Sequence, residues 1–285
     1  MKVYYKFYDL HPQRSFNRLS SAQSRRRGVH LKIDVRRDKS FADFFSHPQL
    51  GDINEEEFLD RFKFQEDEMS QKTFHFLLND AKSRLRFLEN PKSFKNHTLW
   101  AKESNIFESE VFKFKLSAED DFTFLHLLEK NKSVRLDANG VFTKESLASF
   151  VKKIDPGLLS LIEYLEDPTH EEWPSDSPIK FARDFIDQQN HQVRIFKPNR
   201  EFMPKTMKPM IFSSYMGGQL GQWQAYCELM ATGDLNLYHG IQIDHFYETD
   251  IFKKMAPNTF TADKARVKYL YDELMSAEWK VLCSI

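Results

Sequence analysis

Only two cysteines, Cys227 and Cys283, occur among the 285 residues. They are too few and too far apart to form a disulfide framework, so the sequence favours a reducing, cytoplasmic setting. The amino terminus lacks the apolar core and the small-residue cleavage site of a signal peptide. No stretch reaches the ~18 apolar residues that a membrane span requires. We therefore expect neither a secreted disulfide-rich scaffold nor a membrane-spanning protein.

An excess of charge of one sign is also missing, because the formal net charge is -1. This balance argues against a general nucleic-acid-binding or membrane-surface role. The tightest basic cluster is Arg25, Arg26 and Arg27, which is either a solvated loop or an anion-binding loop near a site. The oligomeric state cannot be inferred from these features.

What the chain does have is phenylalanine, with 27 residues, and a hydrophobic fraction of 41%. A chain of this length can bury a large core, arranged as one large or two moderate domains. Residues 1–90 predict a small α+β unit. Strands are expected around residues 3–8 and 29–35, a helix starting at Asn54, and a second helix over about 70–88 that ends at Asn90-Pro91. The second helix is expected to bury Phe74, Leu77, Leu78, Ala81 and Leu85.

After residue 90 short apolar runs alternate with helical patterns, which indicates parallel strand pairing. Eight such runs predict the eight strands of a closed barrel. They are residues 98–101, 111–116, 134–137, 162–166, 179–184, 193–197, 210–214 and 240–243. Helices capped by Ser117 and Thr143 are predicted between runs two and four, and residues 222–230 and 263–275 are also expected to be helical. Residues 102–110 and 185–192 are too short for a crossover helix, so part of the outer helical layer should be missing.

The second run, VFKFKL, carries a charged face. Strand side chains alternate, so Lys113 and Lys115 point to one side, while Phe112 and Phe114 point to the other. If the phenylalanines pack under helices, both ammonium groups enter the barrel, which is costly unless anions lie nearby. The alternative is an exposed amphipathic edge strand.

Carboxylates follow the next three strands. Asp137 ends the third run, Glu166 the fourth and Asp184 the fifth. Because barrel enzymes place their chemistry at the carboxyl ends of the strands, these groups can meet and bind a hard divalent ion, Mg²⁺ above all. Lys197 follows the sixth run. A metal with a lysine on either side suits removal of a proton from carbon next to a carboxylate. The plainer interpretation of Asp137-Ala138-Asn139-Gly140 is a turn.

In order along the chain, KFK, RLDAN, a Glu before Asp-Pro, the Asp of the fifth strand and FKP resemble the site motifs of the enolase superfamily, and most closely its muconate-lactonizing subgroup. The turn at residues 47–52, Lys95-Asn96-His97, Ser213-Ser214 and His239-Gly240 are similar to further family positions. The resemblance implies a modified TIM-type (β/α)7β barrel with some outer helices shortened or missing, plus an N-terminal α+β capping domain. Its boundaries would be 1–95 for the cap, joined by 255–285, and 96–254 for the barrel.

The resemblance also implies roles for individual residues. Asp137, Glu166 and Asp184 would bind Mg²⁺, with Mn²⁺ as a substitute. Lys115 would abstract the proton, Lys113 would assist it, and Lys197 would stabilise charge across a small-molecule carboxylate substrate. Asn139 would support the metal site, and Ser213 and Ser214 would hold the distal part of the substrate. Residues 20–27 would read the substrate from the cap.

The implied reaction is dehydration of a cyclohexadiene carboxylate by a carbon–oxygen lyase. Two alternatives stay open. One is an epimerase, racemase or cycloisomerase on the same scaffold, although no Asp-x-Asp occurs at Gln242-Ile243-Asp244. The other is a barrel without catalytic activity that binds a partner through its cap. Phe185 follows Asp184 where the family usually has a serine, which leaves the surroundings of this ligand open.

Overall fold

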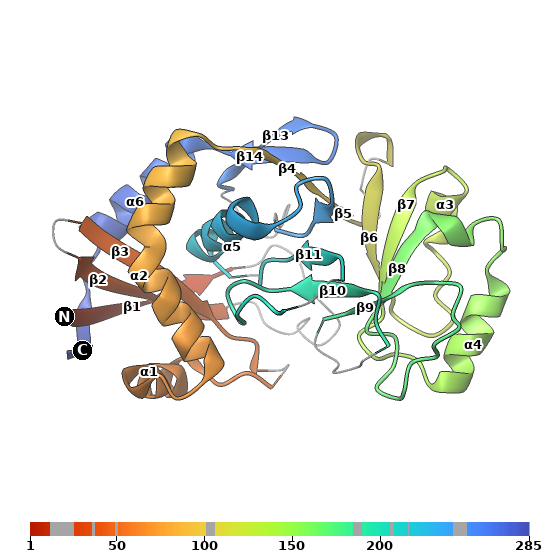
Figure 1. The fold of residues 1–285 in the computed structure, drawn as a ribbon, viewed down its shortest axis with the longest axis horizontal. Helices are drawn as coiled ribbons and strands as arrows, with labels where there is room; N and C mark the ends of the chain where they lie inside the picture. The colour runs from red at the N-terminus through yellow and green to blue at the C-terminus, as the bar shows by residue number, and fades with distance from the viewer. Residues whose placement is uncertain are drawn as a thin grey trace.

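The computed structural model describes residues 1–11, 26–35, 38–48, 51–100, 106–184, 190–205, 208–215, 217–241 and 250–284. The predicted contacts of residues 20–25, Phe185 and residues 242–244 lie outside these ranges. The first unit contains an antiparallel sheet with the strand order β15-β1-β2-β3. Its strands are β1 (Lys2–Leu10), β2 (Arg26–Val35), β3 (Asp38–Phe45) and β15 (Lys280–Ser284). Figure 1 shows both chain termini at this end of the molecule.

Two helices cover the cap sheet, as predicted. Helix α1 (Glu55–Phe64) begins at Asn54, whose side chain accepts a hydrogen bond from the backbone of Glu57, and helix α2 (Glu68–Glu89) begins at Asp67. The predicted buried face of α2 is partly wrong, because Leu78 and Leu85 are 45% and 60% exposed. The buried face instead follows Phe76, Leu77, Asp80 and Phe87. Strand β3 was not predicted.

Seven strands form one curled parallel sheet, in the order β11-β10-β9-β8-β7-β6-β5. They are β5 (Thr98–Leu99), β6 (Val111–Lys115), β7 (Ser133–Asp137), β8 (Ile162–Glu166), β9 (Phe181–Arg183), β10 (Val193–Phe196) and β11 (Met210–Phe212). A single bridge joins Ser213 beyond β11 to Gly240, beyond β12 (Tyr238–His239). Strand β12 pairs with β4 (Ser93–Asn96), which leads directly into β5. A mixed α/β fold with a curled parallel sheet is therefore confirmed.

The helical layer over this sheet is incomplete, as predicted. Helix α4 (Lys144–Lys153) carries the expected cap, since Thr143 and Ser146 form a capping box. The helix predicted from Ser117 is wrong. Ser117 bonds to Asp121 within a turn, and only the short α3 (Leu125–Leu128) follows. The remaining described elements are the 3-10 turns η3 (Ile106–Glu108) and η4 (Leu159–Leu161), the strands β13 (Phe252–Ala256) and β14 (Thr259–Ala262), and the helices α5 (Gln219–Thr232) and α6 (Lys264–Ser276).

Helix α5 joins the cap to the parallel sheet, and Figure 1 shows it between them. The amide of Gln224 pairs with β3 in the manner of a further strand: it accepts from the backbone of Asp43 at 3.2 Å and donates to the carbonyl of Phe41 at 3.1 Å. The Asp43 carboxylate lies over the first turn of α5. A Cβ atom at Gly217 or Gly221 would lie 2.8 or 2.4 Å from Asp43 Oδ2, so only glycine permits this approach.

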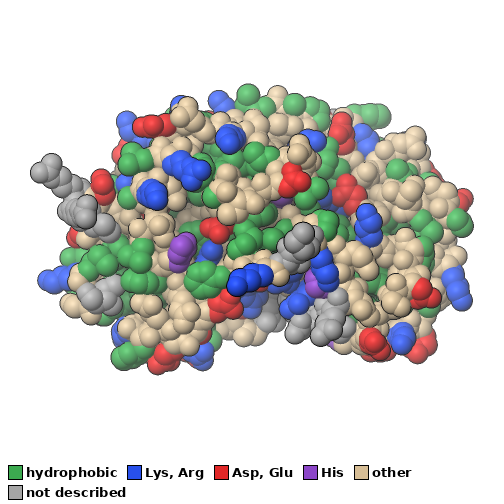
Figure 2. All heavy atoms as spheres, viewed as in Figure 1, with side chains coloured by type: hydrophobic (Ala, Val, Ile, Leu, Met, Phe, Trp, Pro, Cys, Tyr) green, Lys and Arg blue, Asp and Glu red, His purple; other side chains and the backbone are tan. Residues whose placement is uncertain are grey.

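The arginine cluster of the sequence divides between two environments. Arg26 is buried and lies 2.9 Å from His47 Nδ1, whereas Arg27 forms an ion pair with Glu56 on the surface. A wholly solvated loop is therefore wrong for Arg26. On the face drawn in Figure 2, basic and acidic side chains are interspersed, in keeping with the small net charge. In the described ranges no helix is long and apolar enough to cross a membrane.

Asp80 makes the stability of the cap depend on pH. It accepts hydrogen bonds from the Tyr271 hydroxyl and, at 3.1 Å, from the backbone of Phe41, so it links α2 to α6 and β3. Burial raises the pKa of Asp80 to about 6, against which these hydrogen bonds and Arg84 act. The folded state therefore binds this proton more tightly than the unfolded chain does. Stability contributed by the neutral acid is complete below about pH 4 and is lost as the pH rises towards 6.

We predict that Asp80→Asn removes this dependence, which amounts to at most about 3 kcal/mol. The free energy of unfolding of the variant minus that of the unsubstituted chain should increase from pH 4.5 to 7.5, because only the unsubstituted chain loses stability as Asp80 ionises. Chemical denaturation at several pH values measures this difference. Asp60→Asn, on the exposed side of α1, is the matched control and should show no such trend. Parallel curves for Asp80→Asn and the unsubstituted chain would contradict the assignment.

Candidate active site

The register of three neighbouring strands places charged residues side by side. Lys115 on β6 pairs with Asp137 on β7, and Asp137 pairs with Glu166 on β8. Paired residues of a parallel sheet point to the same face. The three side chains therefore form a row at the carboxyl ends of the strands. The predicted inward face of β6 is thus present, and the alternative of an exposed edge strand is wrong, since β6 lies between β5 and β7.

The opposite face of the same strands is apolar. Phe114, Leu136, Leu165 and Phe181 are all buried, and they pack with residues of α3 and α4 in one core cluster. Burying each such side chain contributes roughly 1.5–3 kcal/mol. A shift of one residue in the register of β6 would exchange Phe114 for Lys113 or Lys115 in this core. The aromatic face therefore fixes the direction in which both lysines point.

Lys113 is the cation that two carboxylates share. Its Nζ atom lies 3.0 Å from Asp137 Oδ2 and 2.8 Å from both oxygens of Glu166. Burial disfavours its charged form, but Asp137 and Glu166 outweigh burial and hold the pKa of Lys113 well above its ordinary value. Lys113 is therefore a permanent cation in this arrangement.

Lys115 has the opposite tendency. Its Nζ atom lies 3.8 Å from Asp137 Oδ2, and its side chain is 23% exposed. Burial lowers the pKa of Lys115; Asp137 opposes this shift, while the ammonium groups of Lys113 and Lys197 add to it. A lysine with a lowered pKa presents a neutral amine more readily, which a base requires.

The two shared carboxylates differ in turn. Burial would raise the pKa of Asp137, but Lys113 and Lys115 outweigh it and the pKa is lowered. Burial raises the pKa of Glu166 to about 7, opposed by Lys113 and reinforced by Asp137 and Asp184. Of the two, Glu166 is therefore the carboxylate that takes up a proton more readily.

Asp184 and Lys197 lie farther along the same edge. Asp184 follows β9, Lys197 follows β10, and the ammonium of Lys197 donates a hydrogen bond to the Asp184 carboxylate. A second ion pair, between Arg194 and Glu201, contacts the backbone of both residues. Arg194 donates to the carbonyl of Asp184 at 2.9 Å and to Glu201 at 2.5 Å, and Glu201 also accepts from the backbone of Lys197 at 3.3 Å.

The remaining predicted residues border this row. Asn139, whose φ is 49°, donates from Nδ2 to Asp137 Oδ1. Ser213 follows β11 directly, and its backbone N–H donates to the carbonyl of Phe196, the residue before Lys197. Ser214 is buried, and its hydroxyl has no hydrogen-bond partner in the part of the chain that the structure describes. Their proposed contacts with a substrate stay predictions.

The chemistry of the donor set fits a magnesium ion, because three carboxylates supply hard oxygen ligands. In the described ranges, however, no three His, Cys, Asp or Glu side chains converge closely enough to hold a metal. The reason is visible in the ion pairs: Lys113 lies between Asp137 and Glu166, and Lys197 engages Asp184. The two ammonium groups neutralise the carboxylates that would otherwise repel each other.

Sequence reasoning missed several charged and aromatic residues near the row. Arg135, 2% exposed, donates to Glu163 at 2.6 Å and to the carbonyl of Tyr238 at 2.8 Å, so it braces the interior one layer below Asp137. It lies two residues before Asp137 on β7, so strand alternation puts both side chains on the same face. Tyr215 and Asp52 had no such signal, because 163 positions separate them in the sequence.

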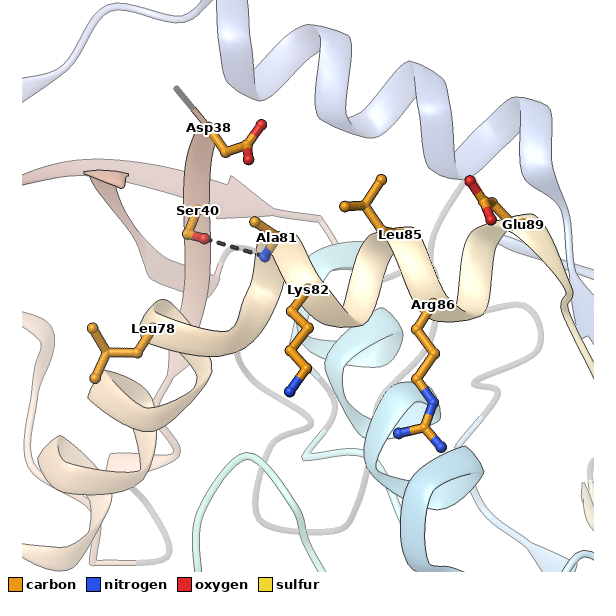
Figure 3. A pocket seen from close by; sticks show the side chains of 8 residues that line it. All are labelled: Asp38, Ser40, Leu78, Ala81, Lys82, Leu85, Arg86 and Glu89. Carbon is orange, nitrogen blue, oxygen red and sulfur yellow. Dashed lines mark hydrogen bonds between the residues drawn. The ribbon is translucent and has the colours of Figure 1, made fainter. Parts of the chain in front are cut away.

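The cavities described in the structure lie away from this candidate site. A groove of about 640 Å³ lies between α2 and the edge of β3, and Figure 3 shows its lining residues, among them Leu78 and Leu85. A second hollow of about 660 Å³ borders α4. Neither is lined by a predicted site residue. The charges at the strand ends, rather than the size of a cavity, identify the candidate active site.

No protein-family model and no curated protein matches this sequence. Solved structures do match across nearly the whole chain. An o-succinylbenzoate synthase from Thermosynechococcus elongatus, complexed with Mg in its active site, is 13% identical with a TM-score of 0.68 and covers 96% of this chain and 100% of its own. A dipeptide epimerase from Enterococcus faecalis, complexed with Mg and the dipeptide L-Leu-L-Tyr, is 9% identical with a TM-score of 0.71 and covers 92% and 96%.

The L-Ala-D/L-Glu epimerase from Bacillus subtilis is 10% identical with a TM-score of 0.66, covering 92% of this chain and 96% of its own. The structures that share the fold are enolase-superfamily enzymes. The resemblance seen in the motifs therefore extends to the fold, which at these identities is what the comparison establishes.

We predict that Mg²⁺ stabilises the folded protein, because the three carboxylates lie close together only in the folded state, so the ion binds that state and not the unfolded chain. At about a hundred times its Kd, an ion that binds only the folded state adds about 2.7 kcal/mol. Adding Mg²⁺ to chelator-treated protein should therefore raise the Tm. Glu166→Gln should blunt the rise, whereas Glu172→Gln, an exposed acid outside the row, should leave it intact. An identical rise in Glu166→Gln would count against Glu166 as a ligand.

Proposed function

We propose that this chain is an enolase-superfamily lyase that removes water from 2-succinyl-6-hydroxy-2,4-cyclohexadiene-1-carboxylate to give o-succinylbenzoate, a step towards menaquinone. One observation carries the proposal: three carboxylates follow one another along the strand ends, with Lys115 on one side of them and Lys197 on the other. They are those of Asp137, Glu166 and Asp184. The fold that displays this row is shared with an o-succinylbenzoate synthase over nearly the full length of both chains.

Asp137, Glu166 and Asp184 would hold a magnesium ion, with Asn139 fixing the orientation of Asp137 through its amide. When bound, such an ion supplies positive charge beside the oxygens of the substrate carboxylate, which is worth several kcal/mol once negative charge develops there. For the carboxylates to meet, Lys113 must release Glu166 while it keeps Asp137. Lys113 would then lie next to Lys115 and maintain the lowered pKa of that base.

Lys115 performs the proton transfers. Its neutral amine takes the proton from the ring carbon that bears the carboxylate, so the C–H bond breaks and its electron pair moves onto the carboxylate. That pair then forms the new double bond to the neighbouring carbon as the bond to the hydroxyl group breaks. The Lys115 ammonium returns its proton to the leaving hydroxyl, which departs as water. The ring becomes aromatic, no oxidant is consumed, and Lys115 ends as a neutral amine.

Lys197 faces the substrate from the other side. Its ammonium stabilises the negative charge that builds up during proton removal and carries no proton to carbon in an elimination on one face. Ser213 and Ser214, which follow β11 next to it along the strand ends, would hold the succinyl arm. The buried hydroxyl of Ser214 has no hydrogen-bond partner among the described residues, so it can form a hydrogen bond with the substrate.

An epimerase is the second candidate, because two lysines on opposite sides of one carbon also suit proton exchange, and several of the matching structures are epimerases. A barrel without catalytic activity is less well supported, since it gives no reason to retain three carboxylates and three lysines in one interior row.

We predict that Lys115→Ala lowers kcat by roughly 10²–10⁴-fold, because the general base is lost. Lys197→Ala should lower kcat by roughly 10²–10³-fold through lost charge stabilisation, with a smaller effect on KM. Formation of o-succinylbenzoate, followed by its absorbance, measures both. Lys130→Ala, in the exposed turn after α3, is the matched control and should retain full activity.

Isotope exchange separates lyase from epimerase. In heavy water the lyase should convert the cyclohexadiene carboxylate and leave N-acylated amino acids unlabelled. An epimerase would exchange the α-proton of such an amino acid through both lysines. If the protein leaves the cyclohexadiene carboxylate untouched and labels the amino acid, the lyase assignment is wrong and the epimerase stands.

A further inference from the structure

Tyr215 lies against the ammonium of Lys197. The tyrosine follows Ser213 and Ser214 and is 6% exposed. Its ring centroid lies 5.3 Å from Lys197 Nζ and 4.9 Å from the guanidinium carbon of Arg200. The face of an aromatic ring attracts cations, most strongly where water is excluded. The ring therefore provides Lys197 with an attractive contact that neither takes its proton nor neutralises its charge.

The cap fixes the position of this ring. The Tyr215 hydroxyl donates to Asp52, which lies in the turn between β3 and α1. The side chain of Asp52 has no exposed surface, and it also accepts from Arg200 at 2.5 Å and from the backbone of His47 at 2.8 Å. The ring is thus held by a buried acid that belongs to the other unit of the molecule.

His47 holds the backbone of the same residue. Its Nε2 donates to the carbonyl of Tyr215 at 3.0 Å, and its ring meets the Tyr215 ring edge-on at 4.7 Å. Burial lowers the pKa of His47 to about 4, so the imidazole is neutral near pH 7 and its second nitrogen can accept from Arg26. Tyr215 is therefore anchored at both its hydroxyl and its carbonyl by the cap.

The other described partner of the Lys197 ammonium is Asp184. In the proposed function Asp184 is a metal ligand, so its carboxylate turns away from Lys197 when the site is loaded. The Tyr215 ring is then the contact that keeps the ammonium at the site. We propose that Tyr215 is a positioning residue for Lys197, and that Asp52 and His47 make this position depend on the docked cap.

A pair of substitutions separates the ring from the hydroxyl. Tyr215→Leu removes the ring and should lower kcat by roughly tenfold or more with little change in KM, the size expected for a desolvated cation–π contact. Tyr215→Phe loses the contact of the hydroxyl with Asp52 but retains the ring and the contact of His47 with the backbone carbonyl, so it should lose clearly less of kcat than Tyr215→Leu. Tyr4→Leu is the matched control, because it removes a ring that lies 4.5 Å from another lysine, Lys32, on the cap sheet. It should change neither constant. This kinetic test rests on the proposed function.

A second readout does not need turnover. Lysines methylated with ¹³C-formaldehyde give methyl signals, and that of Lys197 is assigned by its loss in Lys197→Arg. The ring should shift this signal upfield in the unsubstituted protein and in Tyr215→Phe, and the shift should vanish in Tyr215→Leu. If Tyr215→Leu does not fold, Tyr215→Met, whose flexible side chain fills irregular space, replaces it.

The outcomes are distinct. An upfield Lys197 signal that depends on the ring supports the positioning role even if the protein fails to convert the proposed substrate, which would overturn only the lyase assignment. Equal losses of kcat in the Phe and Leu variants, or a Lys197 signal that the loss of the ring does not move, would overturn the role of Tyr215.

Discussion

The arrangement of the interior depends on one electrostatic constraint: two lysines that β6 directs inward must find anions. Ammonium groups side by side in a low-dielectric interior are costly unless carboxylates compensate them. The register supplies these carboxylates, since Lys115, Asp137 and Glu166 occupy paired positions on three strands. The aromatic face of the same strands prevents any slip of that register, because a slip would bury a lysine under α3 and α4. The core packing and the chemistry of the site therefore share one cause.

The cap adds a second constraint by reaching the strand ends from outside the sheet. Gln224 and Asp43 join β3 to α5, and Asp52 reaches Tyr215 beside Lys197. These contacts are buried, polar and specific, so they define a single docked position rather than a range of positions. A site built on the parallel sheet thereby becomes sensitive to a unit that contributes none of its carboxylates. Through Tyr215, the cap therefore contacts the surroundings of Lys197.

Much of this was visible in the sequence, for physical reasons that can be named. Side-chain alternation placed Lys113, Lys115 and Asp137 on one face, and cap residues such as Asn54 and Thr143 marked helix starts, because both signals are local. The failures came where tertiary contacts decide. Ser117 forms hydrogen bonds within a turn instead of capping a helix. Helix α2 buries Asp80 and exposes Leu85, because β3 and α6 cover a face of the helix other than the predicted one. Local patterns also cannot predict which lysine pairs with which carboxylate, or that Asp52 contacts Tyr215. These contacts join segments that lie far apart in the sequence.

The central claim is that Asp137, Glu166 and Asp184 form one metal site once Lys113 releases Glu166. Anomalous diffraction from a crystal soaked with Mn²⁺ tests it most directly, because the ion scatters strongly and accepts the same oxygen ligands as Mg²⁺. The account predicts a single strong peak within about 2.3 Å of an oxygen from each of the three carboxylates, with Lys113 moved away from Glu166. A crystal in which Lys113 still lies between Asp137 and Glu166, and in which the metal is absent or bound elsewhere, would contradict it.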